Sequence, residues 1–457
     1  LSGDRLTEAY KTLDDHLAEG VDVVTSLAPG HWLQDHKELG GQFARVDRAG
    51  KTGVKPSLCA AFPEVSDFAN RVGQSVAKTF GGHPALDGAL INTEVRDGTR
   101  LCFHPHDIEA FRRSTGLDVP DAIKDRTGVK YSTIRGFSGD RVVSDEDPIL
   151  TYFRWFWREG DGWNRMHSSV HRGLKSGGPK DVWTFFDPAV RVPPIWGSGG
   201  EVDVISQWTY SYPDPIKMGQ ACDELFAMAK GRPGQRVMKM TQIIWYRTQT
   251  APELPKDESK RVAWEREVPD ARFITISPDH LREAFWCKLA RPIQGIMYHG
   301  WGSLVRAEHG GYRFTNPETA KVLSGLIKEI VTPLGPTLRR IPDRKADVGL
   351  LESFASHVFA GRGAFGWGHG WQADAHLVMQ WAQLQPEVLY EETLMRDGLD
   401  SFKVLMLPWC EVLPSGVVSR IAEFQRKGGI VIGDEFLCPG ISPDIIVPSF
   451  ARTGAPD

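Results

Sequence analysis

Short apolar runs of strand-type composition alternate with amphipathic helical stretches along most of this chain of 457 residues. Such alternation predicts parallel β-strands joined by helices, which is the α/β class. Strands are predicted at residues 21–29, 86–95, 181–188, 201–210, 236–246 and 293–301, and helices at residues 6–17, 65–80, 108–115, 152–174, 217–229 and 278–289. Strand–helix repeats at this spacing favour a (β/α)8 barrel over a single nucleotide-binding sheet.

A different pattern begins beyond Pro342. Strands at residues 346–353, 403–408 and 428–435, with a helix at residues 415–427, predict a small doubly wound α/β domain. A chain of this length also exceeds what one compact core holds. We therefore expect a barrel over residues 1–340 and a second α/β domain over residues 341–457. The count of strands before residue 340 is below eight, so the first barrel strands are missing or unrecognised.

The composition argues against several classes of function. A net charge of −4 provides no basic footprint for nucleic acid or acidic lipid. The second domain has no G-x-G-x-x-G fingerprint, and no cofactor is expected. None of the six cysteines forms a C-x-x-C pair, and no apolar run approaches the ~20 residues of a membrane span. The 15 tryptophans are as consistent with core packing as with sugar stacking.

Several segments, in order, resemble one known family. Residues 83–120 follow a GGHPA step with INTE and then HDIEAFRRSTG, which is similar to the fourth-strand region of family-forty-two glycoside hydrolases, the β-galactosidases of clan A. Residues 201–213 resemble the sixth strand of that family, and residues 280–301 resemble the helix and strand that close the barrel. Residues 403–435 resemble its flavodoxin-like trimerisation domain.

This resemblance implies a (β/α)8 TIM barrel followed by a flavodoxin-like α/β domain, and a β-linked oligo- or polysaccharide as substrate. It also implies a homo-oligomer, a trimer in that family. Residues 21–36 would match the third strand, so that the first two strands would lie outside this sequence.

Glycoside hydrolysis needs two carboxyl groups, one of them protonated, and barrel enzymes carry them at the carboxyl ends of strands. Glu94 stands at such an end, and the resemblance makes it the general acid/base. The alternative is a strand-end salt bridge with Arg96 or Arg100. The family has Asn directly before this Glu, where it binds the sugar 2-hydroxyl. Here Asn92 lies one residue earlier, on the same strand face as Glu94.

The second carboxylate has no direct counterpart. The family places its nucleophilic Glu in a Met-Glu-Gln context, whereas this chain reads Met240-Thr241-Gln242. Neither a hydroxyl nor an amide here forms a stable glycosyl ester. One explanation is a divergent hydrolase whose second carboxylate comes from elsewhere, with Asp187 the best candidate, although an Asp before a Pro is more often a turn residue. The others are a carboxylate outside this sequence, inversion through an activated water, or a sugar-binding protein that has lost catalysis.

Side chains near the predicted strand ends are candidate sugar contacts. Trp208 and Tyr210 share one strand face, and His299 can hydrogen-bond a hydroxyl group. Each residue alone is as consistent with packing as with ligand binding. The predicted substrate contacts are Asn92, Trp32, Trp208, Tyr210, Gln242, Trp245, Tyr298, His299 and Trp301.

Cys102, His104, His106 and Asp107 lie close together in the sequence. Members of the resembled family sometimes carry a cysteine zinc cluster near this point, but three of the cysteines expected for it are absent here. Cys102, His104 and His106 would share one face of an extended segment, a spacing that allows a metal ion. Loop hydrogen bonding is the default interpretation, and no metal is predicted.

Overall fold

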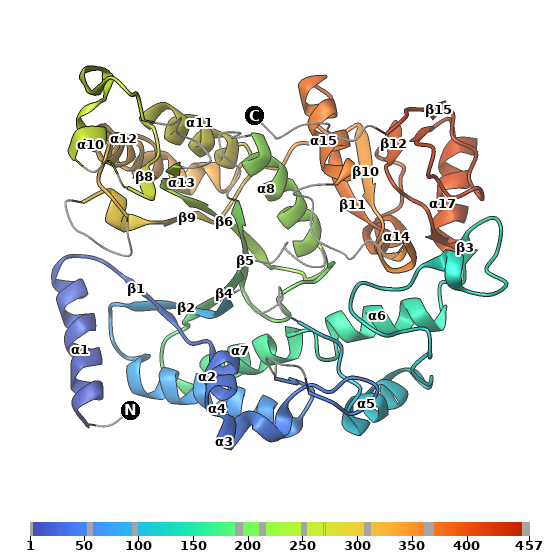
Figure 1. Cartoon of the computed structure of the whole chain (residues 1–457), viewed down its shortest axis with the longest axis horizontal. Coiled ribbons are helices and arrows are strands. Elements are labelled where there is room, and N and C mark those ends of the chain that lie inside the picture. Colours follow the sequence, from blue (N-terminus) through green and yellow to red (C-terminus); the bar gives the residue numbers. More distant parts are fainter. Residues whose placement is uncertain are drawn as a thin grey trace. The chain divides into compact units, whose positions relative to one another are not determined.

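A computed structural model describes residues 3–52, 58–93, 99–187, 195–209, 216–247, 254–267, 269, 271–305, 312–360 and 370–449. They form parallel strands joined by helices, the α/β architecture of a TIM-type barrel followed by a flavodoxin-like domain, as predicted (Figure 1). The chain divides into two compact units: Leu1–Ile205, Ala227–Gln235 and Ala346–Phe450 make the first, and Ser206–Phe226, Arg236–Lys345 and Ala451–Asp457 the second. The domain boundary at residue 340 stays a prediction.

The elements up to residue 235 are α1 (Gly3–Ala18), β1 (Val23–Ser26), α2 (Pro29–Asp35), α3 (Lys37–Gly40), η1 (Gly41–Phe43), α4 (Pro63–Phe80), β2 (Leu86–Thr93), α5 (Pro105–Thr115), η2 (Tyr131–Thr133), β3 (Val142–Val143), α6 (Pro148–Arg158), α7 (Asn164–Gly177), β4 (Trp183–Asp187), β5 (Val204–Thr209) and α8 (Ile216–Ala229). The next are β6 (Arg236–Gln242), β7 (Ile244–Tyr246), η3 (Glu258–Lys260), α10 (Ala263–Glu267), β8 (Phe273–Thr275), α11 (Pro278–Leu289), β9 (Gly295–His299), η4 (Trp301–Ser303), α12 (Pro317–Leu326), η5 (Ile327–Val331) and α13 (Thr332–Leu338). The last are β10 (Val348–Glu352), α14 (Phe354–Ala360), α15 (Trp371–Trp381), β11 (Glu387–Tyr390), α16 (Glu391–Asp397), β12 (Val404–Leu407), β13 (Leu413–Pro414), α17 (Ser415–Arg426), β14 (Ile430–Gly433) and β15 (Ile445–Ile446). None of the described helices is long and apolar enough to cross a membrane.

In the first unit β1, β2 and β4 pair in parallel, and β4 continues the pairing to the start of β5. Helix α7 covers one face of β4. His171 Nδ1 lies 2.8 Å from Thr184 Oγ1, and the His167 ring lies 4.2 Å from the Phe186 ring. Because side chains alternate along a strand, Asp187 lies on the opposite face, away from α7.

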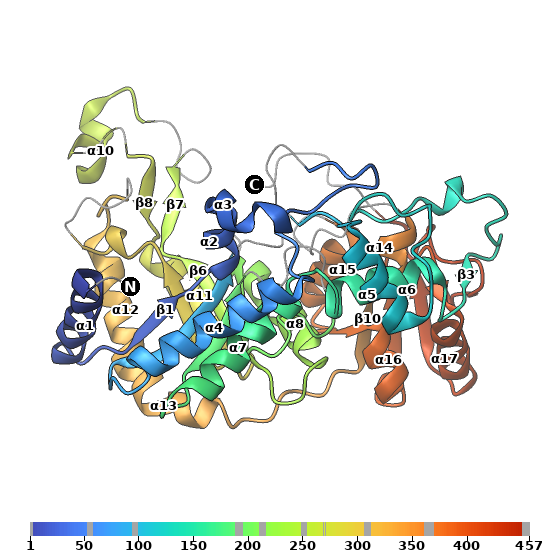
Figure 2. The same cartoon turned by 90° about the horizontal axis from the view of Figure 1, so that it is seen from below.

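Helices α4 and α7 lie side by side and touch through glycines (Figure 2). A Cβ atom on Gly73 would lie 2.4 Å from the carbonyl oxygen of Val170, and one on Gly173 would lie 2.1 Å from that of Asn70. The two backbones are therefore in direct contact, and no larger residue fits at either glycine without moving a helix.

The single helix predicted over residues 152–174 is wrong, because the structure has two helices there, α6 and α7. The break contains Gly160, Asp161 and Gly162, and Trp163 at its end has the left-handed φ of 74°. Buried side chains on both sides of the break continue the apolar pattern, so periodicity alone reads the segment as one helix.

In the second unit β6 and β9 pair in parallel, with Thr241 opposite Tyr298 and Gln242 opposite His299. Thr241 Oγ1 lies 3.5 Å from Met218 Sδ of α8, and Lys288 Nζ of α11 lies 4.9 Å from the Tyr298 ring. Thr241 and Tyr298 therefore face the covering helices, and Gln242 and His299 face the other side of the strands.

Lys288 lies in this helix-facing layer, fully buried, and in the part of the chain that the structure describes its Nζ has no hydrogen-bond partner. Burial, followed by the charge of Lys239, lowers the pKa of Lys288 from 10.5 to about 7. At a pH between these two pKa values, Lys288 carries a proton in the unfolded chain and lacks it in the folded chain. The contribution of Lys288 to stability therefore rises with pH. At pH 7 nearly all of the free-energy cost of burying the Lys288 amine is present.

Replacing Lys288 by Met is expected to raise the melting temperature by roughly 10 °C at pH 7, and by steadily less toward pH 10. Scanning calorimetry across this pH range measures the difference. Lys321→Met is the control, because Lys321 is an exposed lysine on α12 and its loss should change little. A gain for Lys288→Met that is the same at every pH would contradict the assigned cause.

The C-terminal sheet has the parallel order β11-β10-β12-β14-β15. A two-stranded parallel ladder joins β13 to β3, with Leu413 opposite Val142. Beside it Asp145 accepts hydrogen bonds from Ser415 Oγ at 3.0 Å and from the Gly416 amide. A single apolar cluster contains Phe153 and Phe156 of α6 together with Val358 of α14. Helix α14 and residues 101–157 thus share a core within the first unit.

Candidate active site

The carboxyl ends of β2 and β4 bring polar side chains together in the first unit. Thr93 pairs with Asp187, and the register between the strands is irregular from Leu90 to Thr93. Asn92 lies inside this irregular stretch and is fully buried, and neither polar atom of its amide has a hydrogen-bond partner among the described residues. Asp187 is 2% exposed. Bulges commonly re-aim a side chain beside a functional site, and a buried free amide costs free energy unless a ligand uses it.

Glu94, the predicted general acid/base, lies outside the described residues, directly after the end of β2. Tyr210 also lies outside them, directly after β5. Both assignments stay predictions.

Two tryptophans of the predicted set are placed at accessible positions. Trp32 of α2 is 43% exposed and forms a stack with His36 and Phe68, at ring distances of 4.0 and 5.6 Å. Trp208 is half-buried on β5, on the same face as Val204. Because His36 and Phe68 already stack on the indole of Trp32, its assignment as a sugar contact stays a prediction.

In the second unit, Gln242 and His299 end β6 and β9 as a pair. Gln242 is buried, and its Oε1 has no hydrogen-bond partner in the described stretches of the chain. His299 is exposed, and its Nε2 lies 2.8 Å from the Tyr312 hydroxyl. Trp301 on η4 is 64% exposed. Gln242 and His299 thus carry hydrogen-bonding groups, and Trp301 has an exposed ring.

Trp245 and Tyr298, which are also predicted sugar contacts, pack against neighbouring side chains of the second unit. Trp245 packs on an apolar cluster of the second unit, with its ring edge-on to His280 at 5.0 Å. Tyr298 faces the helices beside Lys288. Packing accounts for these contacts, and the assignment of both residues as sugar contacts stays a prediction.

The structure shows which way the side chains point at the position that the family resemblance assigns to the nucleophile. Thr241, which the resemblance aligns with the family's nucleophilic Glu, faces α8 through its contact with Met218. The side chain on the opposite face of β6 is Gln242. This amide can donate and accept hydrogen bonds, but it cannot serve as a glycosyl nucleophile.

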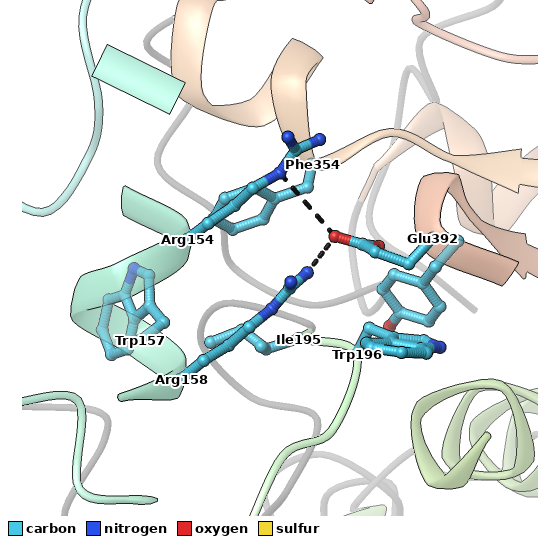
Figure 3. A pocket seen from close by; sticks show the side chains of 8 residues that line it. Arg154, Trp157, Arg158, Ile195, Trp196, Phe354 and Glu392 are labelled. Atoms are coloured by element: carbon cyan, nitrogen blue, oxygen red, sulfur yellow. Dashed lines mark hydrogen bonds and ion pairs between the residues drawn. The ribbon is translucent and has the colours of Figure 1, made fainter. Parts of the chain in front are cut away.

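A shallow pocket with no enclosed space for a water molecule is lined by residues of α6 and by residues at the carboxyl end of the C-terminal sheet. Figure 3 shows Arg154 and Arg158 both reaching Glu392 in it. Arg154 also pairs with the buried Glu391 at 3.0 Å. The carboxylates compensate the positive charges, so the pocket offers no net charge to a ligand and we assign it none.

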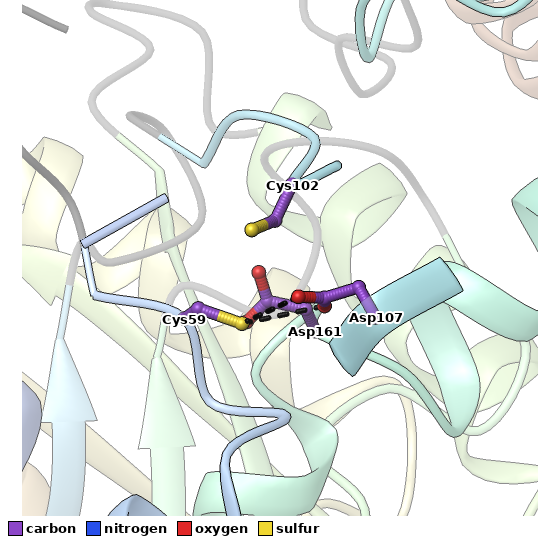
Figure 4. A group of neighbouring side chains, drawn as sticks. All are labelled: Cys59, Cys102, Asp107 and Asp161. Carbon is purple, nitrogen blue, oxygen red and sulfur yellow. Dashed lines mark hydrogen bonds between the residues drawn. The ribbon is translucent and has the colours of Figure 1, made fainter. Parts of the chain in front are cut away.

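Cys102 and Asp107 belong to a cluster that their spacing in the sequence did not predict. Cys59, Cys102, Asp107 and Asp161 converge, with their ligand-type atoms all within 4.8 Å of one another and all four side chains buried (Figure 4). Cys59 and Asp161 come from distant loops, so no local motif could reveal them. His104 and His106 are not part of the cluster: His104 Nδ1 caps α5 by accepting from the His106 amide, and His106 Nε2 bonds the Ala61 carbonyl at 2.8 Å.

The cluster does not fit the zinc site that the family resemblance implies. Both carboxylate oxygens of Asp161 already meet Arg45, at 2.6 Å from Nε and 2.9 Å from Nη2, and the Ala60 amide donates to the same carboxylate at 2.5 Å. A zinc ion would have to share these oxygens with a fixed positive charge. No catalytic step is assigned to a metal here.

Comparison with known proteins gives a likeness of fold. No family model and no curated protein sequence matches the chain. Among solved structures, the β-galactosidase from Bacillus circulans sp. alkalophilus matches with a TM-score of 0.63 at 14% identity, covering 95% of this chain and 65% of that enzyme. The cold-adapted β-galactosidase from Rahnella sp. R3 matches with a TM-score of 0.60 at 16% identity, covering 94% and 63%.

An exo-carrageenase of family forty-two from Bacteroides ovatus matches with a TM-score of 0.52 at 10% identity, covering 96% of this chain and 63% of that one. The chain thus spans about two thirds of the length of these enzymes. Its fold is that of the family-forty-two β-galactosidases, which confirms the predicted TIM barrel with a flavodoxin-like domain.

Proposed function

We propose that this protein is a divergent glycoside hydrolase acting on a β-linked oligo- or polysaccharide, with Glu94 as general acid/base and Asp187 as the second carboxylate. One observation carries the proposal. Asn92, a buried amide without a hydrogen-bond partner in the described chain, and Asp187, a buried carboxylate, stand at the ends of the adjacent strands β2 and β4. Glu94 follows β2 directly in the sequence. Barrel enzymes carry their catalytic groups at such ends.

The chemistry assigns one task to each residue. Glu94 would protonate the glycosidic oxygen as the bond to the leaving group breaks, and Asp187 would stabilise or attack the positively charged anomeric carbon. The Asn92 amide would bind a sugar hydroxyl and so satisfy its own buried polar atoms. Trp32, Trp208, Tyr210, Gln242, His299 and Trp301 are the proposed sugar contacts, and a homo-oligomer is part of the proposal.

A second candidate is a sugar-binding protein of the same fold without catalysis. The observation in its favour is Gln242, an amide on the face of β6 opposite Thr241, near the point where the family resemblance expects the nucleophilic Glu. An amide there would retain hydrogen bonds to sugar hydroxyls and would lose the covalent step.

Hydrolysis of a panel of aryl α- and β-glycosides and of plant and algal oligosaccharides separates the two candidates. Turnover of a β-glycoside by the purified chain, together with the configuration of the released sugar by NMR, is expected for the hydrolase. Retention would indicate carboxyl groups about 5–5.5 Å apart, and inversion about 6.5–9.5 Å. Calorimetric binding of an oligosaccharide without any turnover would leave the sugar-binding protein.

A further inference from the structure

The cluster of Cys59, Cys102, Asp107 and Asp161, called here the thiol–carboxylate cluster, needs a positive charge, because an ionised carboxylate is costly to bury alone. Arg45 brings that charge. Its side chain is 2% exposed, and its Nη2 also donates to the backbone carbonyl of Asp161 at 2.7 Å. A guanidinium keeps its proton at every physiological pH, so Arg45 stays positively charged.

Arg45 and the Ala60 amide surround the carboxylate of Asp161. Oδ1 receives Arg45 Nη2 and the Ala60 amide, and Oδ2 faces Arg45 Nε. The other carboxyl group, Asp107, receives the Cys59 thiol at 3.2 and 3.3 Å. Burial, with repulsion from Asp161, raises the pKa of Asp107 to about 9. With Asp107 neutral, Arg45 faces the carboxylate of Asp161 and the Cys102 thiol, whose pKa the hydrogen bond with Cys59 lowers to about 7.

Arg45 also connects the cluster to the end of the loop that follows β2. Its guanidinium lies 5.4 Å from the centre of the Trp163 ring, and the Trp163 indole Nε1 donates to Thr99 Oγ1 at 2.8 Å. Backbone hydrogen bonds join the same loops, from Cys59 to Phe43 at 2.8 Å and from Phe103 to Val46 at 2.9 Å. Stretches far apart in the sequence therefore meet at one buried charge.

We propose that Arg45 is the structural cation of the thiol–carboxylate cluster, in the role that a metal ion plays in a cysteine zinc site, so that the loops after β1 and β2 are held by a buried ion pair that requires no metal. The inference does not depend on catalysis by Glu94.

Metal analysis of the wild-type chain tests the proposal directly. We expect zinc well below one ion per chain by plasma mass spectrometry, and the same melting temperature in EDTA and in excess zinc chloride. Added Co²⁺ should give no thiolate-to-cobalt charge-transfer absorption in the near ultraviolet. Retention of one zinc per chain after dialysis against EDTA, a thiolate–cobalt band, or a lower melting temperature in EDTA would each overturn the proposal.

Variants test the role of the charge. Arg45→Met leaves the buried charge of Asp161 without its partner and should lower the melting temperature by roughly 5 °C, whereas the double variant Arg45→Met with Asp161→Leu should recover most of that loss. Arg112→Met is the matched control, because Arg112 forms an exposed ion pair with Asp118 and its loss should have little effect. If Arg45→Met does not fold, Arg45→Lys and the double variant still test the role of the Arg45 charge. A double variant no more stable than Arg45→Met, or an Arg45→Lys variant that gains a thiolate–cobalt band, overturns the assignment.

Discussion

Replacing Glu94 by Gln is expected to lower kcat/KM for β-glycoside hydrolysis by about 10³-fold, which is within the usual contribution of a general acid. The amide cannot deliver a proton to the leaving oxygen, so the loss should be largest for sugars with poor leaving groups. Substrates with an activated aryl leaving group need little proton donation and should retain most of their rate in the first step. Initial rates on a series of aryl glycosides of graded leaving-group pKa measure this dependence.

The control for this variant is Glu109→Gln. Glu109 is a half-exposed carboxylate on α5, paired only loosely with Arg112 at 3.5 Å, and its replacement should leave turnover unchanged. Sugar binding measured by calorimetry should survive in Glu94→Gln, because the proton matters for bond cleavage. Equal turnover by Glu94→Gln and wild type on every leaving group would remove Glu94 from the acid/base role.

If the enzyme retains configuration through a covalent glycosyl intermediate, replacing Asp187 by Asn should lower turnover by a factor of about 10³ or more. Asp187 is buried at the end of β4, on the face away from α7. A 2-deoxy-2-fluoro glycoside with a good leaving group would slow the second step and label the nucleophile. Peptide mass spectrometry is expected to find the label on Asp187.

Asp181→Asn is the matched control for Asp187, since Asp181 precedes β4 at the opposite end and is exposed beside Lys175. A label on another carboxylate, or full activity in Asp187→Asn, would sink the assignment of Asp187. In that case Gln242→Glu is the next test, because it places a carboxylate next to the position that the family resemblance aligns with the nucleophile, on the face of β6 opposite Thr241.

The sequence predicts the strands and the fold class well, because buried parallel strands read as continuous apolar runs whatever packs on them. The predicted strand at residues 236–246 is the instructive exception. Its first part is β6, but the chain turns at Ile243, and β7 leaves to pair antiparallel with β8. Nothing in the apolar pattern marks this turn, because Ile243 at the turn and Ile244 directly after it are both buried.

The candidate site is predicted less completely, since it depends on which face a side chain takes. Thr241 and Gln242 are neighbours in the sequence, and only the contact with Met218 shows that Thr241 faces a helix. The thiol–carboxylate cluster escapes sequence reasoning for another reason. Arg45 and Asp161 are separated by 116 residues, and neither stands in a recognisable spacing with Cys102.

The ladder between β3 and β13 has a consequence for synthesis of the chain on the ribosome. Asp145 and its partner Ser415 are 270 residues apart. At about 5–20 residues per second, roughly 15 to 50 seconds pass between their appearance, during which α6 exposes its apolar face without its final neighbours. The nascent chain in this interval is therefore the form most dependent on chaperones, and a ribosome stalled before residue 413 would leave an aggregation-prone product.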